Sequence, residues 1–154
     1  HEDGLAEIST RIHAMSEPER DALRQTLRIG IQWDTQVTLS DCKHAVSQAY
    51  CSALPVAYSR HPDILWADFA QLVLEASYEA ALCSAILNLS NTGNNRVFLT
   101  LLGGGAFGNR YAWIFSAIKR SLELFADMDL DVAIVSYGTS NTRVREFVAS
   151  SRGQ

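Results

Sequence analysis

The sequence predicts a single α/β domain, and three observations carry that prediction. The chain has 154 residues, the usual size of one domain with its own hydrophobic core. Hydrophobic residues make up 47% of it and charged residues 19%, a balance typical of soluble globular proteins and not of disordered segments. Residues 97–137 show the pattern strand, helix, strand at the spacing of a βαβ unit, in which the two strands are parallel.

Residues 1–27 are predicted to form two helices that precede a core at residues 28–150. Apolar residues recur at helical spacing from Leu5 to Met15. Ser16 and Glu19 then have the spacing of a capping box, with a proline between them in the first turn, where its missing N–H is tolerated. This second helix is expected to continue to about residue 27.

Two strands are predicted next. Apolar and polar residues alternate from Ile29 to Leu39, which indicates a strand or two half-strands. The stretch 45–58 is nearly all small or apolar, as expected of a strand buried on both faces. Pro55 cannot donate a backbone hydrogen bond, so the regular strand should end close to Leu54.

The remaining elements follow from hydrophobic periodicity. They are a long helix over 65–87, a polar loop over 90–95, a strand over 97–102, a helix over 114–125, a strand over 131–137 and a short helix around 143–149. Glu75 and Glu79 lie four residues apart and off the apolar face of the long helix, so we expect them to be a solvated pair.

The strand over 97–102 runs straight into a loop, residues 103–109, that contains four glycines. Glycine permits positive φ and close approach of a ligand to the backbone, and the N–H groups at the start of the following helix favour phosphate oxygens. Asn109 is a suitable N-cap for that helix. The loop therefore predicts an anion cradle, and the alternative is a tight strand-to-helix turn that merely needs glycine.

The same loop satisfies the pattern G-x-G-x-x-G through Gly103, Gly105 and Gly108. A dinucleotide-binding Rossmann site also needs an acid at the end of the next strand. Here that strand ends in Ser136 and Tyr137, and no Gly-Lys-Ser/Thr follows the loop as in a phosphate-binding Walker motif. Both of these nucleotide sites are therefore disfavoured.

Composition excludes several other classes. The net charge of −4, with no basic stripe, argues against a nucleic-acid binder. We find no apolar run of about 18 residues and expect no membrane partner, hence a cytoplasmic protein. Cys42, Cys51 and Cys83 are widely spaced and expected to be free thiols. Cys42 with His44 lacks a second ligand pair, so neither a metal site nor a cofactor is expected.

Taken in order, these segments resemble the macrodomain fold, which binds ADP-ribose. The run VFLTLLGGGAFGN, the helix after it and DVAIVSY are similar to the last βαβ unit of that fold. IQWDTQVTL and AVSQAYCSALPVAY resemble two earlier strands, and the long helix resembles the helix that follows them. The resemblance covers residues 28–148. It implies a three-layer mixed sheet with helices on both faces.

The pairing of QAYCSALPVAYS with LTLLGGGAFGN is more specific. It is similar to a divergent macrodomain branch that includes bacterial effector ADP-ribosylhydrolases acting on ADP-ribosyl-arginine. The resemblance implies that an ADP-ribosylated protein is the partner and, for an effector, delivery into a host cytosol. Macrodomains carry an earlier asparagine-rich loop that nothing before residue 28 resembles. Either the first strands and that loop are missing from this sequence, or this branch uses different residues.

By this resemblance, the glycine loop binds the diphosphate and the distal ribose, and the turn after the last strand flanks the adenine. The implied ligand-binding residues are Gly103, Gly104, Gly105, Ala106, Phe107, Gly108, Asn109, Tyr137 and Asn141. An aromatic residue at the carboxyl end of a parallel strand suits stacking on a base, although a partly buried tyrosine is an equally good interpretation of Tyr137.

Cleavage of an N-glycosidic bond passes through an oxocarbenium-like state. A carboxylate can stabilise this state or direct a water molecule to it. The acids in polar breaks are Asp34, which interrupts an alternating strand, and Asp41. Both are predicted as catalytic residues, and the alternative for each is a turn acid that caps backbone N–H groups. The expected function is thus ADP-ribose binding with hydrolytic removal from a modified side chain. A non-catalytic ADP-ribose reader and another nucleotide or phosphate binder are the alternatives.

Overall fold

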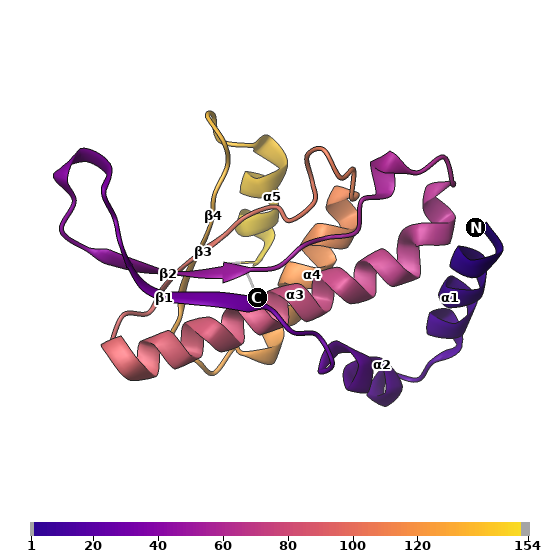
Figure 1. The fold of residues 1–154 in the computed structure, drawn as a ribbon, viewed down its shortest axis with the longest axis horizontal. Coiled ribbons are helices and arrows are strands. Elements are labelled where there is room, and N and C mark those ends of the chain that lie inside the picture. The colour runs from indigo at the N-terminus through magenta and orange to yellow at the C-terminus, as the bar shows by residue number, and fades with distance from the viewer. Residues whose placement is uncertain (1, 152–154) are drawn as a thin grey trace.

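A computed structural model describes residues 2–151, of which 54% are helical and 14% are in strands. The prediction of an α/β fold is confirmed at this level. The elements, labelled in Figure 1, are α1 (Glu2–Ala14), α2 (Glu17–Arg24), β1 (Gly30–Gln36), β2 (Ala45–Tyr50), α3 (Asp63–Thr92), β3 (Arg96–Leu99), α4 (Tyr111–Leu124), β4 (Asp131–Ile134) and α5 (Thr142–Ser151). Two short 3-10 turns, Leu39–Asp41 and Val56–Tyr58, flank β2.

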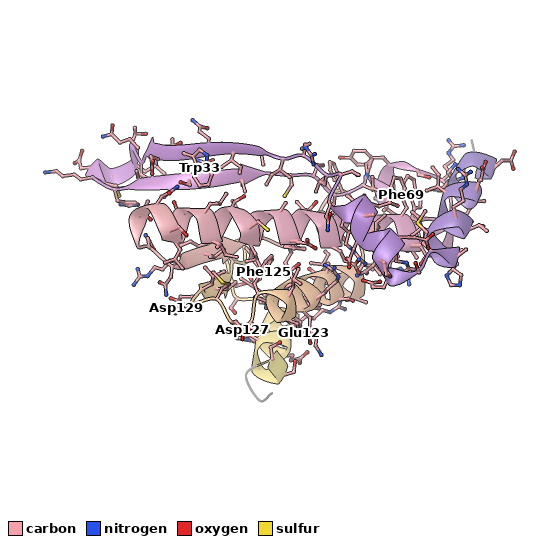
Figure 2. All side chains as sticks on the ribbon, turned by 90° about the horizontal axis from the view of Figure 1, so that it is seen from below. Trp33, Phe69, Glu123, Phe125, Asp127 and Asp129 are labelled. Carbon is pink, nitrogen blue, oxygen red and sulfur yellow. The ribbon has the colours of Figure 1, made fainter. Side chains whose placement is uncertain are left out.

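The strands form two separate two-stranded sheets within residues 2–151, where a single mixed sheet was expected. β1 and β2 are an antiparallel hairpin with a bulge between Gln32 and Thr35. β3 and β4 are parallel, in register from Arg96 opposite Asp131 to Leu99 opposite Ile134. The predicted βαβ unit is therefore confirmed. Figure 2 shows α3 as a layer with the β1–β2 hairpin, which carries Trp33, on one side and α4 on the other.

The 30-residue helix α3 is the centre of the hydrophobic core. Leu74, Tyr78 and Leu82 from α3 pack with Leu99 and with residues of α4. The helix ends one turn later than predicted, at Thr92, because Gly93 takes the left-handed conformation (φ 73°) that closes a helix.

By length and composition alone, α3 is the one helix in the described part of the chain that is apolar enough to cross a membrane, with a mean hydropathy of 1.3 over an 18-residue window. Core helices of soluble proteins pass the same test. Glu75 and Glu79, both engaged in ion pairs with α2 or α4, favour a core helix here.

The prediction that β2 is buried on both faces is wrong. Of its six residues, Ser47 alone is partly buried and the others are exposed. The strand also ends at Tyr50, before the expected Leu54. Small apolar residues fit a doubly covered strand, but they carry no penalty on an open one, so composition alone could not separate the two cases.

The N-terminal helices pack on α3 as a separate layer beside the core. The capping box is confirmed, since the backbone N–H of Ser16 donates to the Glu19 carboxylate at 2.8 Å. These hydrogen bonds from the Ser16 side chain and backbone lower the pKa of Glu19. α2 then ends at Arg24, short of the predicted residue 27.

Ion pairs hold α2 against α3 and α4. The Arg24 side chain is 2% exposed, and its Nε donates to Glu75 Oε2 at 2.8 Å. Arg120 bridges Asp21 (2.7 Å) and Glu79 (2.8 Å). The interpretation of Glu75 and Glu79 as a solvated pair is therefore wrong, because each carboxylate faces an arginine from another helix.

Replacing Arg24 by Ala should lower the free energy of unfolding by about 3–5 kcal/mol, because Glu75 would stay buried without its counter-charge. Urea denaturation followed by circular dichroism measures this loss. Arg28 is the matched control, since its side chain bonds backbone oxygens of its own turn at the surface. Arg28→Ala should change stability by less than about 0.5 kcal/mol. Equal losses in the two variants would contradict the assignment.

Candidate functional site

The glycine loop, residues 103–109, lies at the carboxyl end of β3 and leads into α4 (Figure 1). It packs against the segment that follows β2: the N–H of Ala57 donates to the carbonyl oxygen of Phe107 at 2.9 Å. The loop therefore lies where the chain segments after β2 and β3, strands of two different sheets, meet. This is the edge of an α/β fold at which ligands commonly bind.

Two of the glycines are required by packing. Gly103 and Gly108 have positive φ (71° and 69°), which other residues rarely adopt. A Cβ on Gly103 would overlap the side chain of Ala53, and one on Gly108 would lie 2.6 Å from the Cβ of Ala57. For these two positions, the interpretation as a tight turn that needs glycine accounts for the residue.

The centre of the loop differs. Gly105 and Ala106 are exposed, and a Cβ added at Gly105 would meet no atom within 4 Å. Gly104 is tighter, with Ile114 Cδ1 3.1 Å from such a Cβ. No packing demand explains Gly105, and its backbone is open to a ligand.

Asn109 does not cap α4 with its side chain, contrary to expectation; the N-cap is Arg110. The Asn109 side chain is buried, and its Nδ2 donates to the carbonyl oxygen of Leu54 at 2.8 Å. Asn109 thereby ties the loop to the chain after β2. Its Oδ1 is buried without a hydrogen-bond partner among the described residues.

The segment after β2 adds side chains that the sequence analysis missed. The Tyr58 ring meets Phe107 edge-on at 5.6 Å between centroids. Asp63, the first residue of α3, accepts a hydrogen bond from Arg110 Nε at 2.7 Å. The available signal was the order strand, helix, strand over residues 45–102, which brings the carboxyl ends of both strands to the same side of the connecting helix.

The two candidates after β4 occupy different environments. Tyr137 is fully exposed, so the interpretation as a partly buried tyrosine does not apply. Asn141 precedes α5 and is engaged locally: its Oδ1 accepts the N–H of Arg143 at 2.9 Å, and its Nδ2 donates to the Tyr111 hydroxyl at 3.2 Å. Tyr111 is the first residue of α4, so this turn lies near the exit of the glycine loop.

The structure does not bring the two predicted catalytic acids to the loop. Asp34 sits at the bulge of β1 with φ 51°, and its N–H donates to Ser47 Oγ at 3.3 Å. Asp41 (φ 55°) lies in the connection before β2, whereas the glycine loop follows the carboxyl end of β3. Figure 1 shows that connection at the left end of the molecule, away from the loop between β3 and α4. Their local geometry suits the alternative of turn acids.

Two cavities of the described residues lie away from the loop. An apolar cavity of about 320 Å³ lies among α1, α2 and α3, and one of about 120 Å³ lies beside Phe125. Figure 2 shows Phe69, which lines the larger cavity, next to the N-terminal helices. Neither cavity is lined by residues 103–109. Within residues 2–151, no group of three metal-ligating side chains is placed to hold an ion.

Tyr78 fixes the approach to the loop. Its hydroxyl donates to the carbonyl oxygen of Thr100 at 2.7 Å and accepts the N–H of Leu102 at 2.9 Å. Burial raises the pKa of Tyr78 well above its ordinary value, and burial also raises the pKa of the Cys51 thiol next to it. Both groups are therefore neutral at physiological pH, and neither is an activated nucleophile.

Comparison of the chain with known protein families, with curated proteins and with solved structures finds no match. The assignment of a function therefore depends on the geometry of the loop and on the resemblance of its motifs.

Tyr78→Phe should cost about 1–2 kcal/mol of stability, since it removes two hydrogen bonds of the loop anchor. The raised pKa adds a pH signature. Stability from Tyr78 is fully present below the unfolded pKa of about 10 and is lost as the pH rises above it. Wild type should thus lose stability more steeply above pH ~10 than Tyr78→Phe, measured by urea titrations across that range. Parallel curves would contradict a buried, neutral Tyr78. Tyr137→Phe is the exposed control.

Proposed function

We propose that this chain is a macrodomain-type ADP-ribose-binding protein that holds the diphosphate on its glycine loop and hydrolyses ADP-ribose from a modified side chain. One observation carries the proposal: Gly105 and Ala106 are open to solvent in the loop between the parallel strand β3 and the N-terminus of α4, which begins at Tyr111. Gly103 and Gly108, on either side of them, are fixed by packing. Backbone N–H groups held in this way suit phosphate oxygens.

The positive charge available to an anionic ligand at the loop is that of Arg110, which is ion-paired with Asp63. Arg110 occupies the N-cap of α4, and its side chain is 61% exposed beside Asp63. A guanidinium at this position adds to the positive end of the helix dipole. The chain as a whole carries −4, so attraction of a diphosphate depends on such a local positive group.

Two exposed tyrosines follow strands whose carboxyl ends lie on the side of the loop. Tyr58 follows β2 and packs its ring edge against Phe107, leaving the residue 71% exposed. Tyr137 follows β4. Aromatic rings on both sides of a diphosphate site suit a nucleotide, whose base stacks on such faces. We assign the adenine to the Tyr137 side, as the resemblance implies.

For hydrolysis, a carboxylate must lie near the scissile bond. Asp34 and Asp41 remain candidates from the sequence, but Asp63 is the acid that contacts Arg110 at the exit of the loop. We therefore add Asp63 as a catalytic candidate. The distance of Asp41 from the loop favours the second candidate function, a reader that binds ADP-ribose without turnover.

Calorimetry with ADP-ribose, NAD and AMP tests the ligand. We expect ADP-ribose to bind and Gly105→Val to abolish that binding, because the branched side chain blocks approach to the backbone. A Cβ at Gly105 meets no atom within 4 Å, so the thermal stability of the Gly105→Val variant should equal that of wild type. Gly4→Val, at an equally open glycine of α1, is the matched control and should bind as wild type. Equal affinity for all three ligands, or none, would contradict ADP-ribose recognition.

Incubation with protein carrying ADP-ribosyl-arginine tests the chemistry. Release of ADP-ribose by wild type, with at least a roughly hundredfold loss in Asp63→Asn, is expected if Asp63 directs water at the anomeric carbon. Asp34→Ala together with Asp41→Ala tests the acids predicted from sequence. Full release by that double variant excludes both acids. Binding without release by wild type identifies a reader.

A further inference from the structure

β2 and β3 are joined by a single crossover helix, α3, but they are not hydrogen-bonded to each other within residues 2–151. They are also the strands of the two sheets that pack against α3. Figure 1 shows both strands running toward the side of the glycine loop, with α3 running the opposite way. A strand–helix–strand unit normally places both strands in one sheet.

The unpaired edge of β3 can be identified from its ladder. The carbonyl oxygens of Asn95 and Leu99 accept N–H groups of β4, at 2.9 Å each. In a parallel ladder the groups alternate, so the N–H and C=O of Phe98 point away from β4. The Phe98 side chain is also 67% exposed. β3 therefore presents both backbone groups and apolar surface along this edge.

β2 has a matching edge, because β1 pairs with its other side. At their carboxyl ends, the two strands converge on one core. Ala53 and Leu99 belong to the same buried cluster, and Asn109 donates to the carbonyl oxygen of Leu54. The two unpaired edges are thus held in fixed relation to each other by α3 and by the glycine loop.

α3 lies under both edges. Asn88 contacts β2 through Ser47 at 3.2 Å, and Tyr78 contacts the end of β3 through Thr100 at 2.7 Å. At 100° per residue, the helical position of Ala85 falls between those of Asn88 and Tyr78. Apolar residues are spread around α3, of whose most apolar 18-residue window 39% is buried, and Ala85 itself is partly buried. A helix of that composition is normally covered all round.

From these edges we propose that an extended, apolar strand of a partner polypeptide inserts between β2 and β3 and joins the two sheets into one five-stranded sheet over α3. Adjacent strands lie about 4.8 Å apart, so an inserted strand would separate β2 from β3 by about 9.6 Å, close to the ~10 Å width of the helix that both contact. In the described part of the chain, β2 and β3 both contact α3 without pairing with each other, which is the arrangement that one intervening strand requires. Isolated two-stranded sheets are only marginally stable, and an inserted strand would pair with the free edge of each sheet.

The occupant is defined by what it must touch. One face of the strand would lie over the α3 surface at Ala85, and the other would continue the exposed surface of Val46, Tyr50 and Phe98. The segment is therefore expected to be rich in Val, Ile and Thr, with neither proline nor charge in its centre.

Fluorescence anisotropy with the full chain and the labelled peptide KTVTVIVTVK tests the proposal. Phe98→Pro removes the outward N–H of β3 but leaves the bonds to β4, whereas Phe98→Thr keeps that N–H. We expect Phe98→Thr to bind as wild type and Phe98→Pro to bind about tenfold more weakly. The same peptide with alternate amides N-methylated on each edge should not bind. Equal binding by the two Phe98 variants or by the methylated peptide would overturn the proposal.

Hydrogen exchange of the wild-type chain decides the matter independently, even where Phe98→Pro does not fold. The peptide should protect residues 45–50 and 96–99 together. Protection of neither strand, or of one alone, overturns insertion between them. Two further outcomes also overturn it: a dimer by light scattering that already protects both edges, and binding of α3 to phosphatidylcholine vesicles in place of the peptide.

Discussion

The burial of α3 is the constraint on which the rest of the structure depends. Apolar residues of this 30-residue helix are spread around its axis and not confined to one face, so other elements must cover it from several directions. α4 takes one side with Ile114 and Ile118, and β2 and β3 take another. Where α3 carries charge, Arg24 and Arg120 neutralise it from neighbouring helices. Those pairs fix which face of α3 the N-terminal helices meet.

The same helix determines the shape of the candidate site. The Tyr78 hydroxyl bonds the backbone of Thr100 and of Leu102 just after β3, and these hydrogen bonds fix the chain where it enters the glycine loop. Asn109 sets its exit by bonding Leu54. Between them, Gly103 and Gly108 are required because neighbouring alanines leave no room for a Cβ. A loop anchored so firmly can expose Gly105 without losing its conformation, which is the preorganisation that an anion site requires.

Local sequence patterns predicted local structure, but they could not predict contacts between residues that are distant in the sequence. The capping box at Ser16, the parallel βαβ unit and the position of the glycine loop all follow from short-range spacing. The partners of Glu75 and Asp63 lie 51 and 47 positions away, so spacing on one helix could not reveal them. Periodicity likewise predicts which face of β2 can be apolar, but it does not predict whether another element covers that face.

The glycine loop and the unpaired edges of β2 and β3 lie in one region of the molecule. The edges of β2 and β3 converge where Ala53 meets Gly103, so a strand between them would border the loop. The centre of the loop, Gly105 and Ala106, is exposed. Any strand that walls this surface would change the affinity for an anion there, and by linkage the anion would change the affinity for the strand by the same factor. The two proposals, anion binding at the loop and insertion of a strand, therefore predict coupled equilibria.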